Sequence, residues 1–300
     1  MARTTFDELL DAGSHFGHLK RKWNPNMAPY IFMERNGIHI IDLYKTIAKI
    51  DEAAAAMKQI TKSGKKVLFV ATKKQAKEIV AEKVSSVGMP YVTERWPGGM
   101  LTNFATIRKA VRKMSSIDKM ITGNSFTVLS KRERLQVTRE RAKLEKNLGS
   151  IADLSRLPAA IFVVDIVKEH IAISEARKLN IPTFAIVDTN SDPQLVDFPI
   201  PANDDASKSI ALILSKMVEA IEEGLTERKM DRDKRADDER EEYDAKERNY
   251  DVDEDDEDLP AASERLRTKP VAGEEGTGEG RPRKPGTRRP IGRKPSGPRK

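Results

Sequence analysis

The chain of 300 residues contains no cysteine. It therefore has no disulfide bond, no thiolate metal site and no cysteine nucleophile, a composition that fits a reducing cytoplasm. Long apolar runs are also missing, since the longest, such as residues 159–164, are far too short to cross a bilayer. The amino-terminal stretch is acidic and has no apolar centre, so it does not resemble a signal peptide. Together these absences predict a soluble, cytoplasmic protein.

The glycine-rich motifs of nucleotide-binding proteins are absent as well. Neither G-x-G-x-x-G nor G-x-x-x-x-G-K-[ST] occurs, and the first buried strand leads into residues 71–78, which contain no glycine. Without these glycines the backbone cannot approach a pyrophosphate closely. An enzyme that binds a nucleotide or a metal at the strand ends, near Lys73, Asp165 and Asp188, remains the alternative hypothesis.

No catalytic combination stands out among the histidines and carboxylates. His15 and His18 lie three residues apart, but without cysteine or an H-E-x-x-H motif they are only weak candidates for a metal site. Imidazoles that pack in a loop or bond to RNA are the simpler interpretation. Asp165 and Asp188 are expected to cap turns. We therefore predict a protein that is not an enzyme and has no cofactor.

The hydrophobic pattern predicts an α/β fold. Apolar runs typical of strands covered on both faces occur at residues 66–72, 159–165 and 182–188, and shorter strands are expected at 38–41, 90–94 and 198–201. Helices are expected at residues 4–12, 45–63, 74–88, 169–180 and 203–224. This alternation is typical of βαβ units in a parallel, doubly wound sheet. Residues 14–37 are expected to be looped or extended chain.

Two long helices folded back on each other are predicted within residues 101–149, as an insertion in the α/β domain. In the first arm, apolar residues recur at three- and four-residue steps, as in a coiled-coil seam: Ile107, Val111, Met114, Ile117 and Ile121. In the second arm, Arg141 stands where an apolar residue would complete the pattern.

The charge of this insertion is one-sided. Residues 101–150 contain twelve Lys and Arg but four Asp and Glu, a net charge of +8, whereas the whole chain carries +7. A solvated helix face would carry mixed signs. The excess predicts contact with the phosphates of RNA or DNA. The cations expected to bind are Arg108, Lys109, Arg112, Lys113, Lys131, Arg132, Arg134, Arg139, Arg141 and Lys143.

A second candidate surface lies in residues 15–35, where aromatic residues alternate with cations. Phe16, Trp23, Tyr30 and Phe32 are suited to stacking on unpaired bases, although rings that pin the loop to the sheet explain them equally well. Trp96 is expected to be a packing anchor at the root of the hairpin. The binding residues expected here and at the root are Lys20, Arg21, Lys22, Trp23, Arg35 and Arg95.

The last 75 residues differ in composition from the predicted domain of residues 1–225. Residues 226–260 carry eight cations and seventeen anions, and residues 261–300 carry twelve cations and four anions. Neither block has enough apolar residues to offset the chain entropy of folding. We therefore expect residues 226–300 to be a disordered tail, with at most a short helical extension at its start.

Five stretches, taken in order, resemble the bacterial ribosomal protein S2 family: residues 12–46, 67–76, 95–107, 157–165 and 181–193. The resemblance implies a flavodoxin-like, three-layer αβα sandwich with a mostly parallel five-stranded sheet and an inserted helical hairpin. It also implies a structural role in the small ribosomal subunit during translation. The implied partners are small-subunit rRNA and neighbouring ribosomal proteins, including the large mRNA-binding protein S1, and neither a membrane nor a small-molecule substrate is expected.

Overall fold

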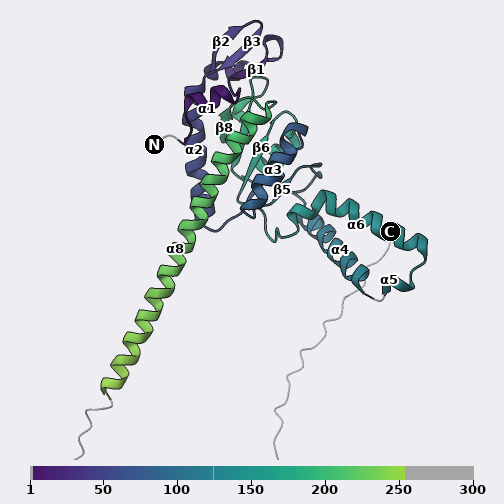
Figure 1. Cartoon of the computed structure of the whole chain (residues 1–300), viewed down its shortest axis with the longest axis vertical. Coiled ribbons are helices and arrows are strands. Elements are labelled where there is room, and N and C mark those ends of the chain that lie inside the picture. The colour runs from purple at the N-terminus through teal and green to yellow at the C-terminus, as the bar shows by residue number, and fades with distance from the viewer. Residues whose placement is uncertain (1–2, 124, 254–300) are drawn as a thin grey trace, which may run out of the picture. The chain divides into compact units, whose positions relative to one another are not determined.

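A five-stranded parallel sheet forms the centre of the computed structural model, which describes residues 3–123 and 125–253 (Figure 1). The strand order is β5-β4-β6-β7-β8, with every neighbouring pair parallel. The strands are β4 (Val67–Val70), β5 (Tyr91–Val92), β6 (Ala160–Val164), β7 (Thr183–Val187) and β8 (Phe198–Pro201). This order reverses between β4 and β6, as in flavodoxin-like folds, and it confirms the predicted fold class.

Helices cover both faces of this sheet. Alternate strand residues such as Phe69, Phe162 and Phe184 face one hydrophobic cluster, which also contains residues of α2, α3 and α8. Their neighbours, such as Leu68 and Ile161, face a second cluster, which includes α7 and the root of the inserted helices. The helices are α1 (Phe6–Asp11), α2 (Leu43–Lys62), α3 (Lys74–Ser86), α7 (His170–Lys178) and α8 (Ser207–Asp253). Because both faces are covered, the central strands are apolar apart from Thr183.

Residues 14–37 form more regular structure than expected. They contribute β1 (Phe16–Leu19), η1 (Lys20–Lys22), η2 (Pro25–Tyr30) and β2 (Ile31–Arg35), and β3 (Ile38–Ile41) joins β1 and β2 in a three-stranded antiparallel sheet. Only the strand at 38–41 was predicted. The turn between β2 and β3 is Asn36-Gly37, with φ of 52° and 73°. Asn-Gly is a strong hairpin signal because both residues tolerate positive φ, so this hairpin was detectable in the sequence.

The predicted insertion is present between β5 and β6. Its arms are α4 (Phe104–Thr122) and α6 (Lys131–Leu148), which contact each other, with the short α5 (Ser125–Val128) at the tip and η3 (Gly149–Ile151) after the second arm. Met114 and Ile117 of the predicted apolar seam are buried. The second arm begins with a capping box, in which Ser130 and Glu133 each bond to the other's backbone N–H. Figure 1 shows α4 and α6 side by side, projecting from the sheet.

The last helix is longer than the expected extension. A disordered tail from residue 226 with a short helical extension at its start was expected, and α8 extends to Asp253. Lys58 and Lys62 of α2 pair with Glu227 of α8 at 2.7 and 3.2 Å, and the residues that follow are mostly good helix formers. Residues 254–300 of the expected tail lie outside the described residues.

Gly224 does not end the last helix, contrary to the predicted boundary. It lies at a close approach of α8 to α2, where an added Cβ would overlap the Thr61 hydroxyl and lie 2.7 Å from the Lys58 carbonyl oxygen. The glycine is therefore explained by packing and not by a helix end. None of the helices within residues 3–123 and 125–253 combines the length and apolar character that a membrane span needs.

Candidate nucleic-acid interface

All four carboxylates of the hairpin are engaged within it. Asp118 and Glu145 both accept hydrogen bonds from Arg141, and Glu140 accepts from Lys113 on the opposite arm. The remaining carboxylate, Glu133, accepts from the Ser130 backbone N–H at 2.9 Å. These anions hold the arms together and cap one of them.

Arg141 has a structural role that the sequence pattern did not suggest. Its Nε bonds to Asp118 of α4, and its Nη1 lies 2.6 Å from Glu145 of its own helix. The hydrogen bond that Arg141 donates to Asp118 raises the pKa of Arg141, which stays charged. The guanidinium thus replaces the expected apolar contact with a bond between the two arms. Arg141 was predicted to bind rRNA, but here it links α6 to α4.

Three further predicted RNA-binding cations are also bonded within the protein. Arg108 donates to the Ser155 carbonyl, and Lys113 pairs with Glu140. Arg134 donates to the Leu129 carbonyl at 2.9 Å and lies over the Phe126 ring, with its Cζ 6.0 Å from the ring centre. These bonds orient the side chains and leave fewer of their donors available to phosphate.

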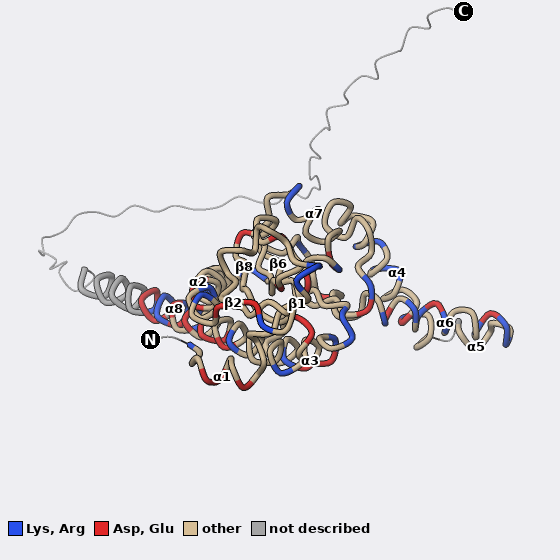
Figure 2. Tube along the Cα trace, turned by 90° about the horizontal axis from the view of Figure 1, so that it is seen from above, with Lys and Arg blue, Asp and Glu red and all other residues tan. Residues whose placement is uncertain are grey.

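Seven other hairpin cations are exposed, and their side chains have no hydrogen-bond or ion-pair partner within the described part of the chain. Figure 2 shows how Lys and Arg, in blue, are distributed along α4 and α6. We call these residues the free hairpin cations: Lys109, Arg112, Lys119, Lys131, Arg132, Arg139 and Lys143. All but Lys119 were among the predicted binding residues. A cationic surface that lacks its own anions is the electrostatic signature of a polyanion-binding site.

A buried glutamate that the sequence analysis missed fixes the root of the hairpin. Glu175 of α7 is 6% exposed and accepts five hydrogen bonds from the loop that leads into α4. Its Oε1 accepts from the Trp96 indole at 3.1 Å and from Gly99 N at 2.8 Å. Its Oε2 accepts from Leu101 N at 2.9 Å and from both the N–H and the hydroxyl of Thr102. The sequence did contain a signal for this role: a carboxylate on the apolar face of a predicted helix will be buried and needs hydrogen-bond partners.

The surroundings of Glu175 keep it ionised. Burial alone would raise the pKa of this carboxyl, but the backbone N–H groups of Thr102 and Leu101, with the Trp96 indole, outweigh burial and lower it. Trp96 itself is buried, as predicted for a packing anchor. Its neighbour Arg95 is exposed. The root is therefore held by the buried Glu175 and Trp96, and it exposes a cation at Arg95.

The antiparallel sheet of residues 16–41 presents the second predicted surface. Lys20 pairs with Glu34 at 2.7 Å, whereas Arg21, Lys22 and Arg35 are exposed and have no side-chain partner within the described residues. Thus only Lys20 of the predicted cations on this sheet is neutralised by a neighbouring carboxylate.

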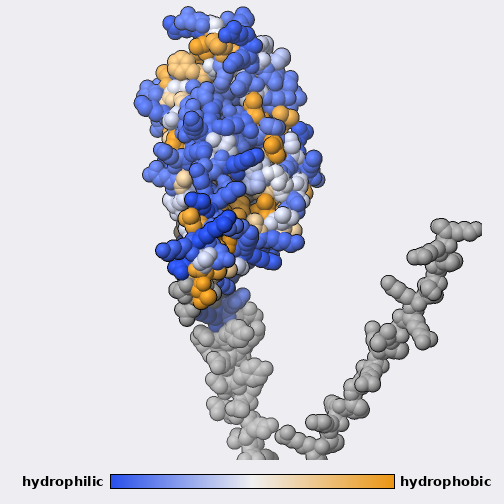
Figure 3. Space-filling model, turned by 90° about the vertical axis from the view of Figure 1, so that its right-hand side faces the viewer, coloured by the Kyte–Doolittle hydropathy of each residue, from blue (hydrophilic) through white to orange (hydrophobic). Residues whose placement is uncertain are grey.

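Some aromatic residues of this sheet pin the segment to the body, whereas others are exposed and suited to stacking on bases. Tyr30 packs against the second hydrophobic cluster, so it pins the segment to the body. Phe32 is 70% exposed, Phe16 is 49% exposed and Trp23 is 36% exposed, with the Trp23 ring centre 5.1 Å from that of His39. In Figure 3, apolar side chains (orange) gather near the end of the body that carries β2 and β3. Exposed rings beside free cations are the combination that stacking on unpaired bases requires.

The edge of the sheet where doubly wound proteins bind ligands is filled by charged side chains. Lys73, which follows β4, lies 2.8 Å from Asp204, 2.6 Å from Asp205 and 3.4 Å from Asp165. As predicted, Asp165 caps a turn, since its Oδ1 accepts from the N–H groups of residues 167 and 168. Asp188 Oδ1 accepts from the N–H of the next residue, Thr189. Its second oxygen lies 2.9 Å from His18 Nδ1.

The amino-terminal segment covers this edge. Thr189, which follows β7, accepts a hydrogen bond from His18 N at 2.8 Å on its side chain and from Asn24 N at 2.8 Å on its carbonyl. Asn203 N donates to the Ser14 carbonyl at 3.1 Å. The chain itself thus lies across the site where a nucleotide would bind in a doubly wound fold.

The electrostatics of the sheet edge are unusual. Burial, followed by the negative charges of Asp188 and Asp165, raises the pKa of Asp204 to about 7. Burial acts to lower the pKa of Lys73, but its bonds to Asp204 and Asp205 raise it overall. The hydrogen bond that His18 donates to Asp188 raises the pKa of His18. Carboxylates here outnumber the cations that face them.

The model of the family described as "Ribosomal protein S2" matches residues 9–224. The chain belongs to the ribosomal protein S2 family. Small ribosomal subunit protein uS2 of Phocaeicola vulgatus is 72% identical over 232 residues, which cover 77% of this chain and 83% of that protein. The corresponding proteins of Parabacteroides distasonis and Porphyromonas gingivalis are each 69% identical over 232 residues, covering 77% of this chain and 84% and 83% of theirs.

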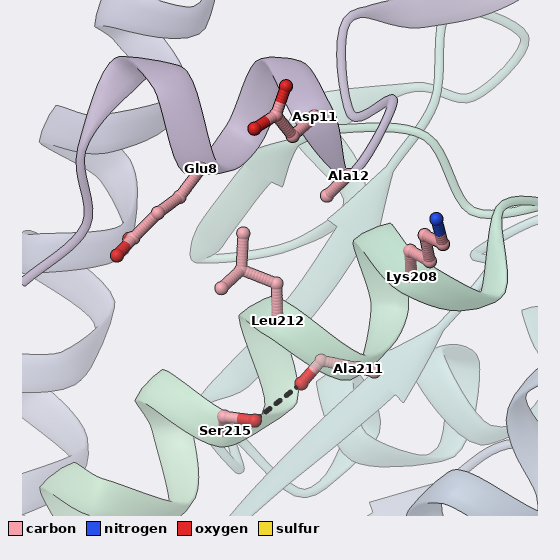
Figure 4. Close-up of a pocket in the computed structure, with 7 residues that line it drawn as sticks. All are labelled: Glu8, Asp11, Ala12, Lys208, Ala211, Leu212 and Ser215. Atoms are coloured by element: carbon pink, nitrogen blue, oxygen red, sulfur yellow. Dashed lines mark hydrogen bonds between the residues drawn. The ribbon is translucent and has the colours of Figure 1, made fainter.

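Membership of the S2 family confirms the resemblance seen in the sequence. The family is structural and not enzymatic, so the predicted lack of enzymatic activity is also confirmed. A hollow lies between α1 and α8. Figure 4 shows that its charged side chains Glu8, Asp11 and Lys208 point in different directions, while Ser215 is bonded to the Ala211 carbonyl at 2.7 Å. Convergent polar groups, which a substrate site requires, are not found in this hollow.

Proposed function

We propose that this chain is a structural constituent of the small ribosomal subunit that binds small-subunit rRNA through the free hairpin cations. The proposal rests on the difference between the anions and the cations of the hairpin. Its carboxylates are used to hold and cap the arms, while seven exposed cations keep their donors unbonded within the described residues.

The spacing of these cations supports contact with a phosphate backbone. Lys109 and Arg112 lie three residues apart on α4, and Arg139 and Lys143 lie four residues apart on α6. Residues at these spacings share a helix face, so the like charges repel each other in the free protein. Binding to phosphates relieves that repulsion and releases counterions from the RNA.

The antiparallel sheet supplies a second contact in this proposal. Arg21, Lys22 and Arg35 provide cations for the sugar–phosphate chain, and the exposed Trp23 provides an aromatic ring. Arg95 extends the same cationic character to the root of the hairpin. Because phosphate contacts fix register without reading sequence, we propose that rRNA shape determines where the protein docks.

We also propose that the protein works on the cytoplasmic ribosome and helps to dock ribosomal protein S1. Family membership supports this, and so does a hollow lined by apolar side chains from α1, β2 and the start of α2, including Phe6, Leu10, Phe32, Met33 and Tyr44. Phe32 and Tyr44 are 70% and 73% exposed. Exposed apolar patches of this kind are typical of protein contacts.

Binding of the full chain to a small-subunit rRNA transcript across a salt series tests the main proposal. A variant with Lys109→Ala, Arg112→Ala, Arg139→Ala and Lys143→Ala should bind more weakly at every salt concentration. Its slope of log K against log[salt] should be shallower by about 3, because each phosphate contact contributes roughly 0.7–0.9.

A matched control removes four exposed cations that lie outside the hairpin and the antiparallel sheet. Lys65, Lys66, Lys74 and Lys178 have side chains without a partner within the described residues. Alanine at these four positions changes the net charge equally and should leave the slope close to the wild-type value. Equal slopes for the wild type and the hairpin variant would refute binding through the free hairpin cations.

A further inference from the structure

Three potential metal ligands from distant parts of the sequence meet at the carboxyl edge of the parallel sheet. They are His18 of β1, Asp188 after β7 and Asp204 in the segment between β8 and α8, and one ligating atom from each lies within 4.8 Å of the other two. Metal–ligand bonds of about 2.0–2.2 Å place neighbouring ligands roughly 3–4 Å apart, so these three atoms would move slightly closer together to share one ion.

The charges at this place do not balance within the protein. Four carboxylates face it, from Asp165, Asp188, Asp204 and Asp205, and a single lysine, Lys73, bonds to three of them. His18 is the other basic group, with Nδ1 2.9 Å from Asp188 and Nε2 3.6 Å from Asp205. Even with His18 protonated, carboxylates outnumber cations by two to one. Buried carboxylates need cations or metal ions nearby.

One carboxylate oxygen in the group has no partner. Asp204 is fully buried, and Lys73 bonds to its Oδ1 at 2.8 Å, but its Oδ2 has no hydrogen-bond partner within the described residues. An unpaired carboxylate oxygen away from solvent costs free energy. This oxygen is available to bind a cation. Its lack of a partner is a second observation, separate from the excess of carboxylates over cations.

We propose that His18, Asp188 and Asp204 bind one divalent transition-metal ion of the Zn²⁺ type. An imidazole with two carboxylates suits Zn²⁺, whereas Mg²⁺ prefers ligand sets made only of oxygen and retains much of its water. Lys73 bonds to Oδ1 of Asp204 and so leaves Oδ2 for the metal. The carboxylates supply the negative charge that a dication neutralises.

The ion would fasten the antiparallel sheet to the parallel sheet. His18 lies on the first, whereas Asp188 and Asp204 follow strands of the second. The hydrogen bond from His18 N to Thr189 already joins these parts. This structural role goes beyond the proposed function, because it concerns how the candidate rRNA-binding sheet is held and not what it binds.

Zinc binding to the full, untagged chain tests this proposal. After EDTA treatment and its removal, we expect titration calorimetry to show one Zn²⁺ per chain. Thermal unfolding should show a Tm higher by roughly 5–10 °C when free Zn²⁺ is about 100-fold above Kd. Mg²⁺ at the same concentration should produce no such shift.

Two variants remove ligands in different ways. His18→Gln keeps a polar group of similar size, and Asp204→Asn keeps the shape while removing a charge. Each should weaken Zn²⁺ binding by at least roughly 10–100-fold. In EDTA, Asp204→Asn should unfold no earlier than the wild type if it relieves repulsion among unpaired carboxylates, so its loss of zinc binding could not be attributed to misfolding.

His170→Gln is the matched control, because His170 is exposed and lies outside the group. It should bind Zn²⁺ as the wild type does. No zinc binding by the wild type, unchanged binding by His18→Gln, or stabilisation by Mg²⁺ but not Zn²⁺ would each overturn the proposal. If the wild type binds no zinc, protonated His18 and Lys73 are the groups within the described residues that balance the charge of these carboxylates.

Discussion

The Glu175→Gln variant tests whether one buried carboxylate holds the hairpin root in place. Glutamine keeps the size of the side chain but replaces one accepting oxygen with an NH₂ group, which donates. If the NH₂ group takes the place of Oε1, the Trp96 indole and Gly99 N lose their acceptor. If it takes the place of Oε2, the N–H groups of Leu101 and Thr102 lose theirs. Either orientation leaves two donors unpaired.

The size of the effect follows from those two donors. Each buried donor left unpaired costs about 1–3 kcal/mol, so the free energy of unfolding should fall by about 2–6 kcal/mol. For a domain of this size, that corresponds to a Tm lower by roughly 5–20 °C. Glu78→Gln is the control, because Glu78 is exposed and its side chain has no partner within the described residues. It should change the Tm little.

The pH dependence of this loss has a defined sign. Because folding lowers the pKa of Glu175, its stabilising contribution is complete above the unfolded-state pKa, about 4.3, and is lost as the pH falls through the lower folded-state value. The difference in stability between the wild type and Glu175→Gln should therefore be constant from pH 7 to pH 5. It should shrink below about pH 4.

Two assays decide the outcome. Thermal unfolding at pH 7 gives the stability difference, and a difference from Glu78→Gln below about 0.5 kcal/mol would refute the assigned role, since that is the scatter of surface substitutions. Binding to rRNA gives the second criterion. Glu175→Gln should lower the affinity but leave the salt slope unchanged, because Glu175 positions the hairpin without contacting phosphate.

Two further substitutions separate packing from RNA contact. Arg141→Ala removes the bond to Asp118 that joins the two hairpin arms, so it should lower the Tm. The slope of rRNA affinity against salt should change by less than about one phosphate contact. A decrease of that slope equal to the decrease caused by removing a free hairpin cation would refute the structural role. Gly224→Ala would gain about 1 kcal/mol from helix propensity alone, but its Cβ would lie 2.7 Å from the Lys58 carbonyl and overlap Thr61. We therefore expect a net loss of about 1–3 kcal/mol in chemical unfolding, and an increase in stability would show that the two helices separate easily.

Much of the architecture could be predicted from local patterns. The strands at 38–41 and 198–201 agree with β3 and β8 residue for residue, and the βαβ alternation gave the parallel sheet. Continuous apolar runs identify strands buried on both faces, because that requirement acts at every residue. The same local analysis missed the β2–β3 hairpin, although its Asn-Gly turn was visible, and it ended the last helix at Gly224.

The candidate interface was only partly predictable. Composition located the excess charge in the hairpin, but it could not sort the cations into those that bond within the protein and those that are free. Arg108, Lys113 and Arg141 are bonded because their partners come from another arm or loop, up to 47 residues away. The spacing of charges along a helix contains no information about such partners.

The sequence by itself determined the α/β class, the inserted hairpin, its positive charge and the family. These properties depend on periodicity, composition and the order of motifs, which are written along the chain. Only the tertiary structure decided that Glu175 bonds to the hairpin root, that Gly224 packs against α2, and that His18 meets Asp188 and Asp204. Each of these depends on side chains far apart in sequence that folding brings within a few ångströms of one another.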